Sequence, residues 1–162
     1  MIQENSTTLA ACVVAKLLET GKTLATAESC TGGLIAARIT DVAGCSAVFY
    51  GGCVTYTNAV KQALVGVRTE TLELYTEVSA QTACEMARGT REKLGTDIGI
   101  STTGFAGPGG GTVRNPAGTV YIALSTSNGE KAWRLELGDI GREAVREAAV
   151  EEIFRKVLFE LH

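Results

Sequence analysis

Apolar residues recur every three to four positions in several stretches of the chain, which is the spacing that predicts helices. The first stretch, residues 8–19, puts Leu9, Val13 and Leu17 on one face and ends before Gly21. A second helix is expected to begin at Thr31 or Gly32. The same spacing predicts helices over residues 58–64, 69–74, 79–94 and 142–161, with Asn58 and Ser79 as capping residues for two of them.

Short apolar runs between these helices predict strands over residues 23–27, 47–57, 97–104, 119–125 and 131–137. Gly51 and Gly52 interrupt the second run and indicate a bulge or a close backbone approach. The last two runs are joined by TSNGE, in which Asn128-Gly129 favours a hairpin turn. Helices alternate with strands early and a hairpin comes late. We therefore predict one α/β domain over residues 1–162, a three-layer α/β/α sandwich with a mixed central sheet.

Composition then narrows the classes of function. The chain has 162 residues, 45% of them hydrophobic, and a net charge of −3. An acidic balance without a basic cluster argues against nucleic-acid binding, and no apolar run is long enough for a bilayer. The start, MIQENSTT, lacks the plan of a signal peptide, so we expect a cytoplasmic protein.

The cysteine and histidine content limits the chemistry further. Five cysteines form no Cys-x-x-Cys pair, and we expect buried, reduced thiols, with Cys12 and Cys84 inside helices. The only histidine is the last residue, His162. A histidine-based triad or metal site is therefore not expected, and any nucleophile needs a different base.

The stretch TAESCTGG carries the first candidate chemistry. It lies where a predicted strand turns into a helix, so the amides after Ser29 could stabilise an oxyanion or a phosphate. A simpler interpretation is that Ser29 or Thr31 only caps the helix. Cys30 is the second candidate nucleophile. Gly32 and Gly33 would leave room for a substrate.

VTYTNAVK carries the second candidate, at the end of the next predicted strand. Lys61 could act as a general base if burial lowered its pKa, and Tyr56 could orient it or relay a proton. Each could also be an ordinary residue, a solvated helix lysine and a half-buried strand tyrosine. A Ser-Lys pair is a known substitute for a histidine triad, although the spacing here gives no direct support for it.

Two further features complete the candidate site. The loop from Gly104 to Gly118 matches neither a Walker A motif nor a dinucleotide fingerprint, but its glycines would let backbone amides approach a ligand closely. A flexible surface loop is the alternative. Arg142 could bind a phosphate, or it could be a solvated surface arginine. Because ligands bind at the carboxyl ends of strands, we expect these segments to converge.

Four ordered motifs, TAESCTGG, GGCVTYTNAVKQALVGV, TGFAGPGGG and NPAGTVYIAL, resemble the CinA carboxy-terminal domain family over almost the whole chain. The resemblance implies an α/β/α fold and hydrolysis of nicotinamide mononucleotide to nicotinate mononucleotide and ammonia, with no metal or organic cofactor. By motif, Ser29 would be the nucleophile, Lys61 the base and Tyr56 its assistant. Cys30, Thr31, Thr103 and Gly104 would stabilise the oxyanion or hold substrate.

The wider set of expected substrate contacts adds Gly32, Gly33, Asn58, Gly107 and Arg142. The expected partner is a small-molecule nucleotide, with neither nucleic acid nor membrane, and a homo-oligomer is left open. Two rivals stand beside the amidase. One is a nucleotide-binding module of the same fold without turnover, and the other is a thiol redox protein that uses Cys30.

Overall fold

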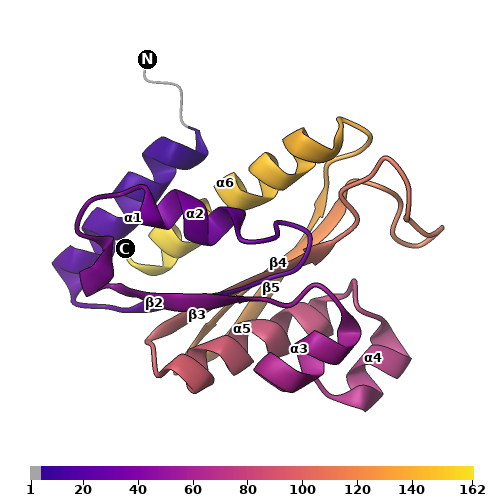
Figure 1. The fold of residues 1–162 in the computed structure, drawn as a ribbon, viewed down its shortest axis with the longest axis horizontal. Coiled ribbons are helices and arrows are strands. Elements are labelled where there is room, and N and C mark those ends of the chain that lie inside the picture. Colours follow the sequence, from indigo (N-terminus) through magenta and orange to yellow (C-terminus); the bar gives the residue numbers. More distant parts are fainter. Residues whose placement is uncertain (1–4) are drawn as a thin grey trace.

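The computed structural model describes residues 5–162, and its helices enclose a single sheet (Figure 1). Residues 1–4, which belong to the polar start of the chain, lie outside the described part. The elements in chain order are α1 (Ser6–Thr20), β1 (Leu24–Glu28), α2 (Leu34–Thr40), a 3₁₀ turn (Cys45–Ala47), β2 (Phe49–Val54), α3 (Asn58–Val65), α4 (Thr69–Tyr75), α5 (Ala80–Leu94), β3 (Ile98–Gly104), β4 (Thr119–Thr126), β5 (Gly129–Glu136) and α6 (Arg142–Glu160).

The sheet has five strands in the order β2-β1-β3-β4-β5. β1 runs parallel to both β2 and β3, whereas β3, β4 and β5 pair antiparallel. Helices α1, α2 and α6 cover one face, and α3, α4 and α5 cover the other (Figure 1). The predicted three-layer α/β/α sandwich with a mixed sheet is therefore confirmed.

The core is built on both faces of β1, whose five residues are all buried. On the α1, α2 and α6 face, Leu17, Ile100 and Phe154 belong to the largest apolar cluster. A smaller cluster around Ala27 and Met86 lies on the α5 face. Burial on both faces explains why β1 shows no alternation of buried and exposed residues, whereas the edge strand β2 alternates along its length.

Two glycines are required by close backbone approach. A Cβ on Gly52 would lie 2.0 Å from Oγ1 of Thr26. The pairing of β1 with β2 also shifts register nearby. The bulge or close backbone approach predicted at Gly51 and Gly52 is therefore confirmed. A Cβ on Gly89 would lie 1.8 Å from the carbonyl oxygen of Val65. The second approach lets α5 pack directly against the end of α3.

Several predicted boundaries are wrong by a few residues. The strand expected over residues 47–57 spans only Phe49–Val54, because a 3₁₀ turn precedes it. α2 begins at Leu34, since Gly32 and Gly33 have φ values of 58° and 100°, which lie outside the helical region. The predicted cap Asn58 is the first residue of α3, and Thr57 caps the helix by accepting from the amide of Val60.

The thiols and the hairpin give one further correction and one confirmation. All five cysteines are free, but Cys12 is exposed, because it lies on the outward face of α1. Only Cys30 is fully buried, while Cys45, Cys53 and Cys84 are half-buried.

The predicted hairpin forms between β4 and β5, with residues 127–128 as its loop. Within residues 5–162, no helix combines the length and apolarity needed to cross a bilayer.

Candidate functional site

The carboxyl ends of the three parallel strands meet at one edge of the sheet. There, Ser29 follows β1, Lys61 lies in the first helix after β2, and Thr103 and Gly104 end β3. Between these segments lies a cavity of about 260 Å³. We call it the Ser29 cavity, and its lining consists of Ser29, Cys30, Tyr56, Lys61, Glu77, Val78, Thr103, Gly104, Phe105, Ala106, Gly107, Gly109, Gly110 and Arg142.

A hydroxyl and an amine are in direct contact in this cavity. Nζ of Lys61 lies 3.1 Å from Oγ of Ser29, although the two residues are 32 positions apart in sequence. Nζ also donates to the carbonyl oxygen of Thr55 at 2.9 Å. The second contact fixes the amine from behind, so that it faces the serine. A nucleophile within hydrogen-bond reach of a base is the arrangement that nucleophilic catalysis requires.

Burial changes the acid–base behaviour of Lys61. Its side chain is only 1% exposed. Loss of hydration lowers the pKa of the Lys61 amine from its ordinary value of 10.5, while the negative charge of Glu77 opposes that shift. A lowered pKa raises the fraction of neutral amine near neutral pH, and only the neutral amine can accept a proton. The interpretation of Lys61 as a solvated helix lysine is therefore wrong.

Cys30 behaves differently from its neighbour. Burial raises the pKa of the Cys30 thiol from 9.0 to about 12, and the attraction of Lys61 and Arg146 offsets this only in part. The thiol therefore stays protonated at neutral pH, and a protonated thiol is a poor nucleophile and a poor redox group. The raised pKa therefore disfavours both the Cys30 nucleophile and the thiol redox alternative.

The turn after Ser29 leaves two amides without a partner on any other residue of the described chain. The carbonyl of Ser29 accepts from the amide of Gly32 at 3.0 Å, which closes the turn. The amides of Cys30 and Thr31 donate to no acceptor on another residue of the described chain. Unpaired amides beside a nucleophile are the components of an oxyanion hole.

Glu28, whose role the sequence did not reveal, organises the same turn. Its carboxylate accepts from the amides of Ile35 and Ala36 at 2.8 and 3.1 Å and from the Thr31 hydroxyl at 2.7 Å. That hydroxyl also lies 2.7 Å from the hydroxyl of Thr102. The amides that open α2 are therefore satisfied inside the protein, and the free amides lie before them, next to Ser29.

Tyr56 and Arg142 form the outer wall of the cavity. Arg142 donates to the hydroxyl of Tyr56 at 3.2 Å and to the carbonyl of Gly107 at 3.0 Å. Tyr56 is 57% exposed, and no hydrogen bond joins it to Lys61 in the described chain. The contact with Gly107 attaches α6 to the glycine-rich loop.

The structure brings together eight of the twelve predicted site residues. The cavity lining includes Ser29, Cys30, Tyr56, Lys61, Thr103, Gly104, Gly107 and Arg142. Four do not line it. The Thr31 hydroxyl points to Glu28, Gly32 and Gly33 shape the turn behind Ser29, and Asn58 is exposed on α3.

Two residues of the site were missed from the sequence. Glu77 lines the cavity, and its carbonyl accepts from the Thr103 hydroxyl at 2.6 Å. Thr76 before it has a φ of 68°, an uncommon value for a β-branched residue, and this bend carries the chain past the cavity.

Arg146 is the second residue that was missed, and it donates to the carbonyl oxygens of Cys30 and Thr31. No local pattern reveals a residue that acts across more than a hundred positions.

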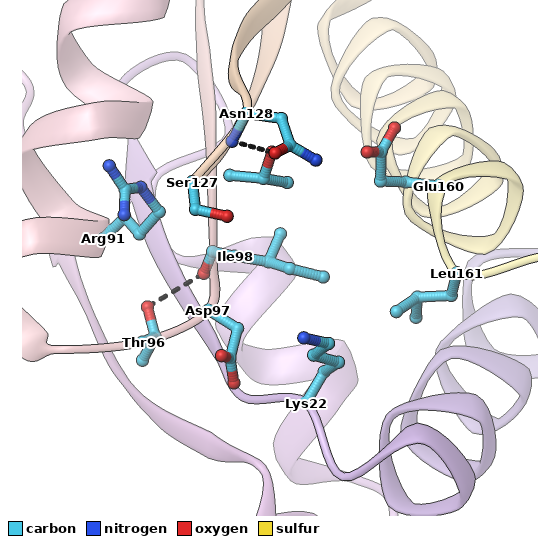
Figure 2. Close-up of a pocket in the computed structure, with 10 residues that line it drawn as sticks. Lys22, Arg91, Thr96, Asp97, Ile98, Ser127, Asn128, Glu160 and Leu161 are labelled. Carbon is cyan, nitrogen blue, oxygen red and sulfur yellow. Dashed lines mark hydrogen bonds between the residues drawn. The ribbon is translucent and has the colours of Figure 1, made fainter.

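A second cavity, of about 290 Å³, lies at the opposite edge of the sheet (Figure 2). Lys22 points into it, but Asp97 is bonded to Thr23 and Glu160 to Lys131. No hydrogen bond in the described chain joins Ser127 to a base there. Residues 5–162 also contain no group of three or more His, Cys, Asp or Glu side chains placed to hold a metal ion. The contact between the Ser29 hydroxyl and the buried Lys61 amine therefore makes the Ser29 cavity the candidate site.

Comparison with proteins of known structure supports the fold. The chain superimposes with a TM-score of 0.93 on a competence/damage inducible protein from Agrobacterium tumefaciens, with 40% identity and coverage of 99% of this chain and 98% of that one. The TM-score is 0.94 for a competence-damaged protein (CinA) superfamily protein from Enterobacter cloacae, with 30% identity and coverage of 100% and 95%.

Sequence comparison gives the same family. A CinA-like protein from Synechocystis is 48% identical over 145 residues, which are 88% of this chain and 35% of that protein. One from Desulfovibrio desulfuricans is 50% identical over 143 residues, 88% of this chain and 33% of that protein. The chain thus spans about a third of the length of the curated relatives it matches. The family model of the CinA C-terminal domain matches residues 6–161, and the chain belongs to that family.

Proposed function

We propose that this protein is an amidase that hydrolyses the carboxamide of nicotinamide mononucleotide to nicotinate mononucleotide and ammonia. The observation that carries the proposal is the 3.1 Å contact between Ser29 and the buried Lys61. The nucleotide as substrate comes from the resemblance of the four motifs to the family. The Ser-Lys contact supports the reaction type.

In the first half-reaction, Oγ of Ser29 forms a bond to the carboxamide carbon, and its proton passes to Nζ of Lys61. The amides of Cys30 and Thr31 stabilise the oxyanion that develops on the carboxamide oxygen. Lys61 then gives the proton to the amide nitrogen, the C–N bond breaks, and ammonia leaves. The result is an ester between Ser29 and the nicotinoyl group.

In the second half-reaction, water attacks the ester carbon while Lys61 accepts a proton from it. The bond to Oγ breaks, and Lys61 returns that proton to Ser29. Nicotinate mononucleotide leaves, and the enzyme is restored. Because Lys61 contacts Ser29 directly, the transfer needs no relay, and Tyr56 is assigned to the cavity wall with Arg142.

Charge supports a phosphorylated substrate. Among residues 5–162, Arg142 is the only arginine that lines the Ser29 cavity, and it lies beside Gly107 of the glycine-rich loop. A guanidinium and nearby loop amides suit a phosphate. Thr103 and Gly104 would then hold the ring end near Ser29.

The alternative is a nucleotide-binding module without turnover, which would be expected if Lys61 lay away from the serine. The observed contact favours the enzyme. The test is ammonia release from nicotinamide mononucleotide by the wild type, Ser29→Ala and Lys61→Met. We expect turnover only by the wild type. Tight binding in calorimetry without product would favour the module instead.

A further inference from the structure

We propose that Arg146 is a positioning residue for the oxyanion hole: it holds the peptide plane between Cys30 and Thr31 so that the unpaired amides face the nucleophile. Arg146 lies in the second turn of α6, more than a hundred residues from the turn that it contacts. This inference rests on the proposed amidase function, because it assigns a task to the amides after Ser29.

Two contacts define the arrangement. Nε of Arg146 donates to the carbonyl oxygen of Cys30 at 3.1 Å, and Nη2 donates to that of Thr31 at 2.8 Å. Both atoms belong to one planar guanidinium, which presents its donors in a rigid fork. Two consecutive carbonyls are therefore held by a single rigid group.

The orientation of the amides follows from peptide geometry. In a trans peptide the carbonyl and the following N–H point in opposite directions. Arg146 binds the Cys30 carbonyl, so the amide of Thr31 points away from Arg146. The carbonyl of Ser29 accepts from the amide of Gly32. The amide of Cys30 belongs to the same peptide as that carbonyl, so it points away from Gly32. Arg146 itself does not line the Ser29 cavity, whereas Cys30 does. Arg146 therefore supports the turn from behind.

The guanidinium of Arg146 makes its hydrogen bonds to backbone carbonyls and none to a carboxylate of the described chain. Within residues 5–162 no carboxylate lies within ion-pair distance of it, although Glu143 and Glu147 lie on the same helix. Glu147 is bonded instead to Arg38 and Ser6. A half-buried arginine that uses its donors on two carbonyls of a catalytic turn, in place of adjacent carboxylates, points to a role in fixing that turn.

The guanidinium is also close to the turn's glycine. A Cβ on Gly32 would lie 3.7 Å from Nη2 of Arg146, and Gly32 has a left-handed φ of 58°. The turn therefore bends around the guanidinium, with the carbonyls on its side. Without Arg146, the carbonyl of Thr31 would keep the amide of Leu34, which donates to it at 3.0 Å. The carbonyl of Cys30 has no other donor in the described chain, so the peptide plane between Cys30 and Thr31 would be free to rotate.

The experiment compares steady-state deamidation of nicotinamide mononucleotide by the wild type, Arg146→Ala and Arg146→Lys. A displaced oxyanion donor acts mainly on the transition state, so we expect kcat to fall by about 10- to 100-fold while KM stays unchanged. Free guanidinium at millimolar concentration should restore part of the kcat of Arg146→Ala. Arg146→Lys should fall between the two, since one ammonium cannot hold both carbonyls in a fork.

Arg155→Ala is the matched control. Arg155 lies on the same helix, half-buried, with ion pairs to Glu151 and Glu152, and it does not line the Ser29 cavity. Its substitution should leave kcat unchanged, with no response to guanidinium. If Arg146→Ala does not fold, Arg146→Lys carries the comparison of kcat with KM.

A second readout separates this inference from the proposed function. The backbone amide resonances of Cys30 and Thr31, followed by nuclear magnetic resonance, should shift in Arg146→Ala and not in Arg155→Ala, whatever reaction the protein performs. A wild type without ammonia release would contradict the amidase alone. Unchanged amide resonances, an unchanged kcat, or a rise in KM alone would overturn the role of Arg146.

Discussion

The chemistry of the site depends on the surroundings of one amine. Lys61 is almost fully buried, and loss of hydration lowers its pKa while the negative charge of Glu77 acts in the opposite direction. Desolvation is the largest of these effects. A lowered pKa favours the neutral amine, which the proposed mechanism needs to accept the proton of Ser29 without a histidine.

Glu77→Gln tests the electrostatic control of this base. The negative charge of Glu77 favours the protonated form of Lys61, so its removal should lower the pKa of Lys61 further. The acidic limb of the kcat/KM profile, which reports the free enzyme's base, should therefore move to lower pH. Glu73→Gln, an exposed position on α4, should leave the profile in place. A limb that stays fixed in Glu77→Gln, or moves to higher pH, would remove Glu77 from the account.

Lys61→Met should abolish turnover and yet increase stability. The pKa of Lys61 is lower in the folded protein than the value of about 10.5 expected for the unfolded chain. Between these two pKa values the folded wild type binds fewer protons than the unfolded chain, so its stability rises with pH there. Methionine removes this cost, and we expect a gain of about 1 kcal/mol at neutral pH. The gain should shrink as the pH approaches 10.5. Urea unfolding across this pH range measures it, with Lys93→Met, an exposed position, as the unaffected control.

The candidate side chains could be predicted from the sequence only where chemical type and position in a strand–helix pattern coincided. Ser29 and Lys61 satisfied both conditions, and the structure brings them into contact. Glu77 and Arg146 could not be found in this way. Glu77 reaches the cavity through a strained bend at Thr76, and Arg146 acts through tertiary packing of α6 against the turn.

At the scale of elements, two helices fix the geometry of the turn after Ser29 and of Lys61. α2 is joined to the end of β1 through the Glu28 carboxylate, which accepts from two of its amides. α3 carries Lys61 and is held against α5 where Gly89 approaches Val65. The start of α2 could not be predicted closely, since the left-handed glycines at positions 32 and 33 delay it.

Gly89→Ala tests the support of the base by its neighbouring helix. Alanine in a helix interior normally stabilises by about 1 kcal/mol relative to glycine. Here its Cβ would lie 1.8 Å from the Val65 carbonyl, so α3 must move, and we expect a net destabilisation of about 1 to 3 kcal/mol. Displacement of Lys61 should also lower kcat. Chemical denaturation and the deamidation assay measure both effects.

Glu92→Ala, an exposed substitution three residues along the same helix, is the matched control and should change neither stability nor kcat. A Gly89→Ala variant as stable as the wild type, with full activity, would show that the close approach of α5 does not hold Lys61 in place.

At the scale of the whole molecule, the candidate site follows from the parallel half of the sheet. The ends of β1, β2 and β3 lie next to one another because these strands pair in parallel, and this brings Ser29, Lys61 and Thr103 to one cavity. The antiparallel strands β4 and β5 extend the sheet on the far side of β3. The layering could be predicted from alternating helices and strands, whereas the strand order required the structure.

The most direct test of the account is the release of ammonia from nicotinamide mononucleotide, measured together with nicotinate mononucleotide by chromatography. We expect equal amounts of both products from the wild type and none above background from Ser29→Ala or Lys61→Met. Ser127→Ala, in the cavity at the opposite edge of the sheet, should retain wild-type turnover. Ammonia release by Ser29→Ala at the wild-type rate would contradict the central claim.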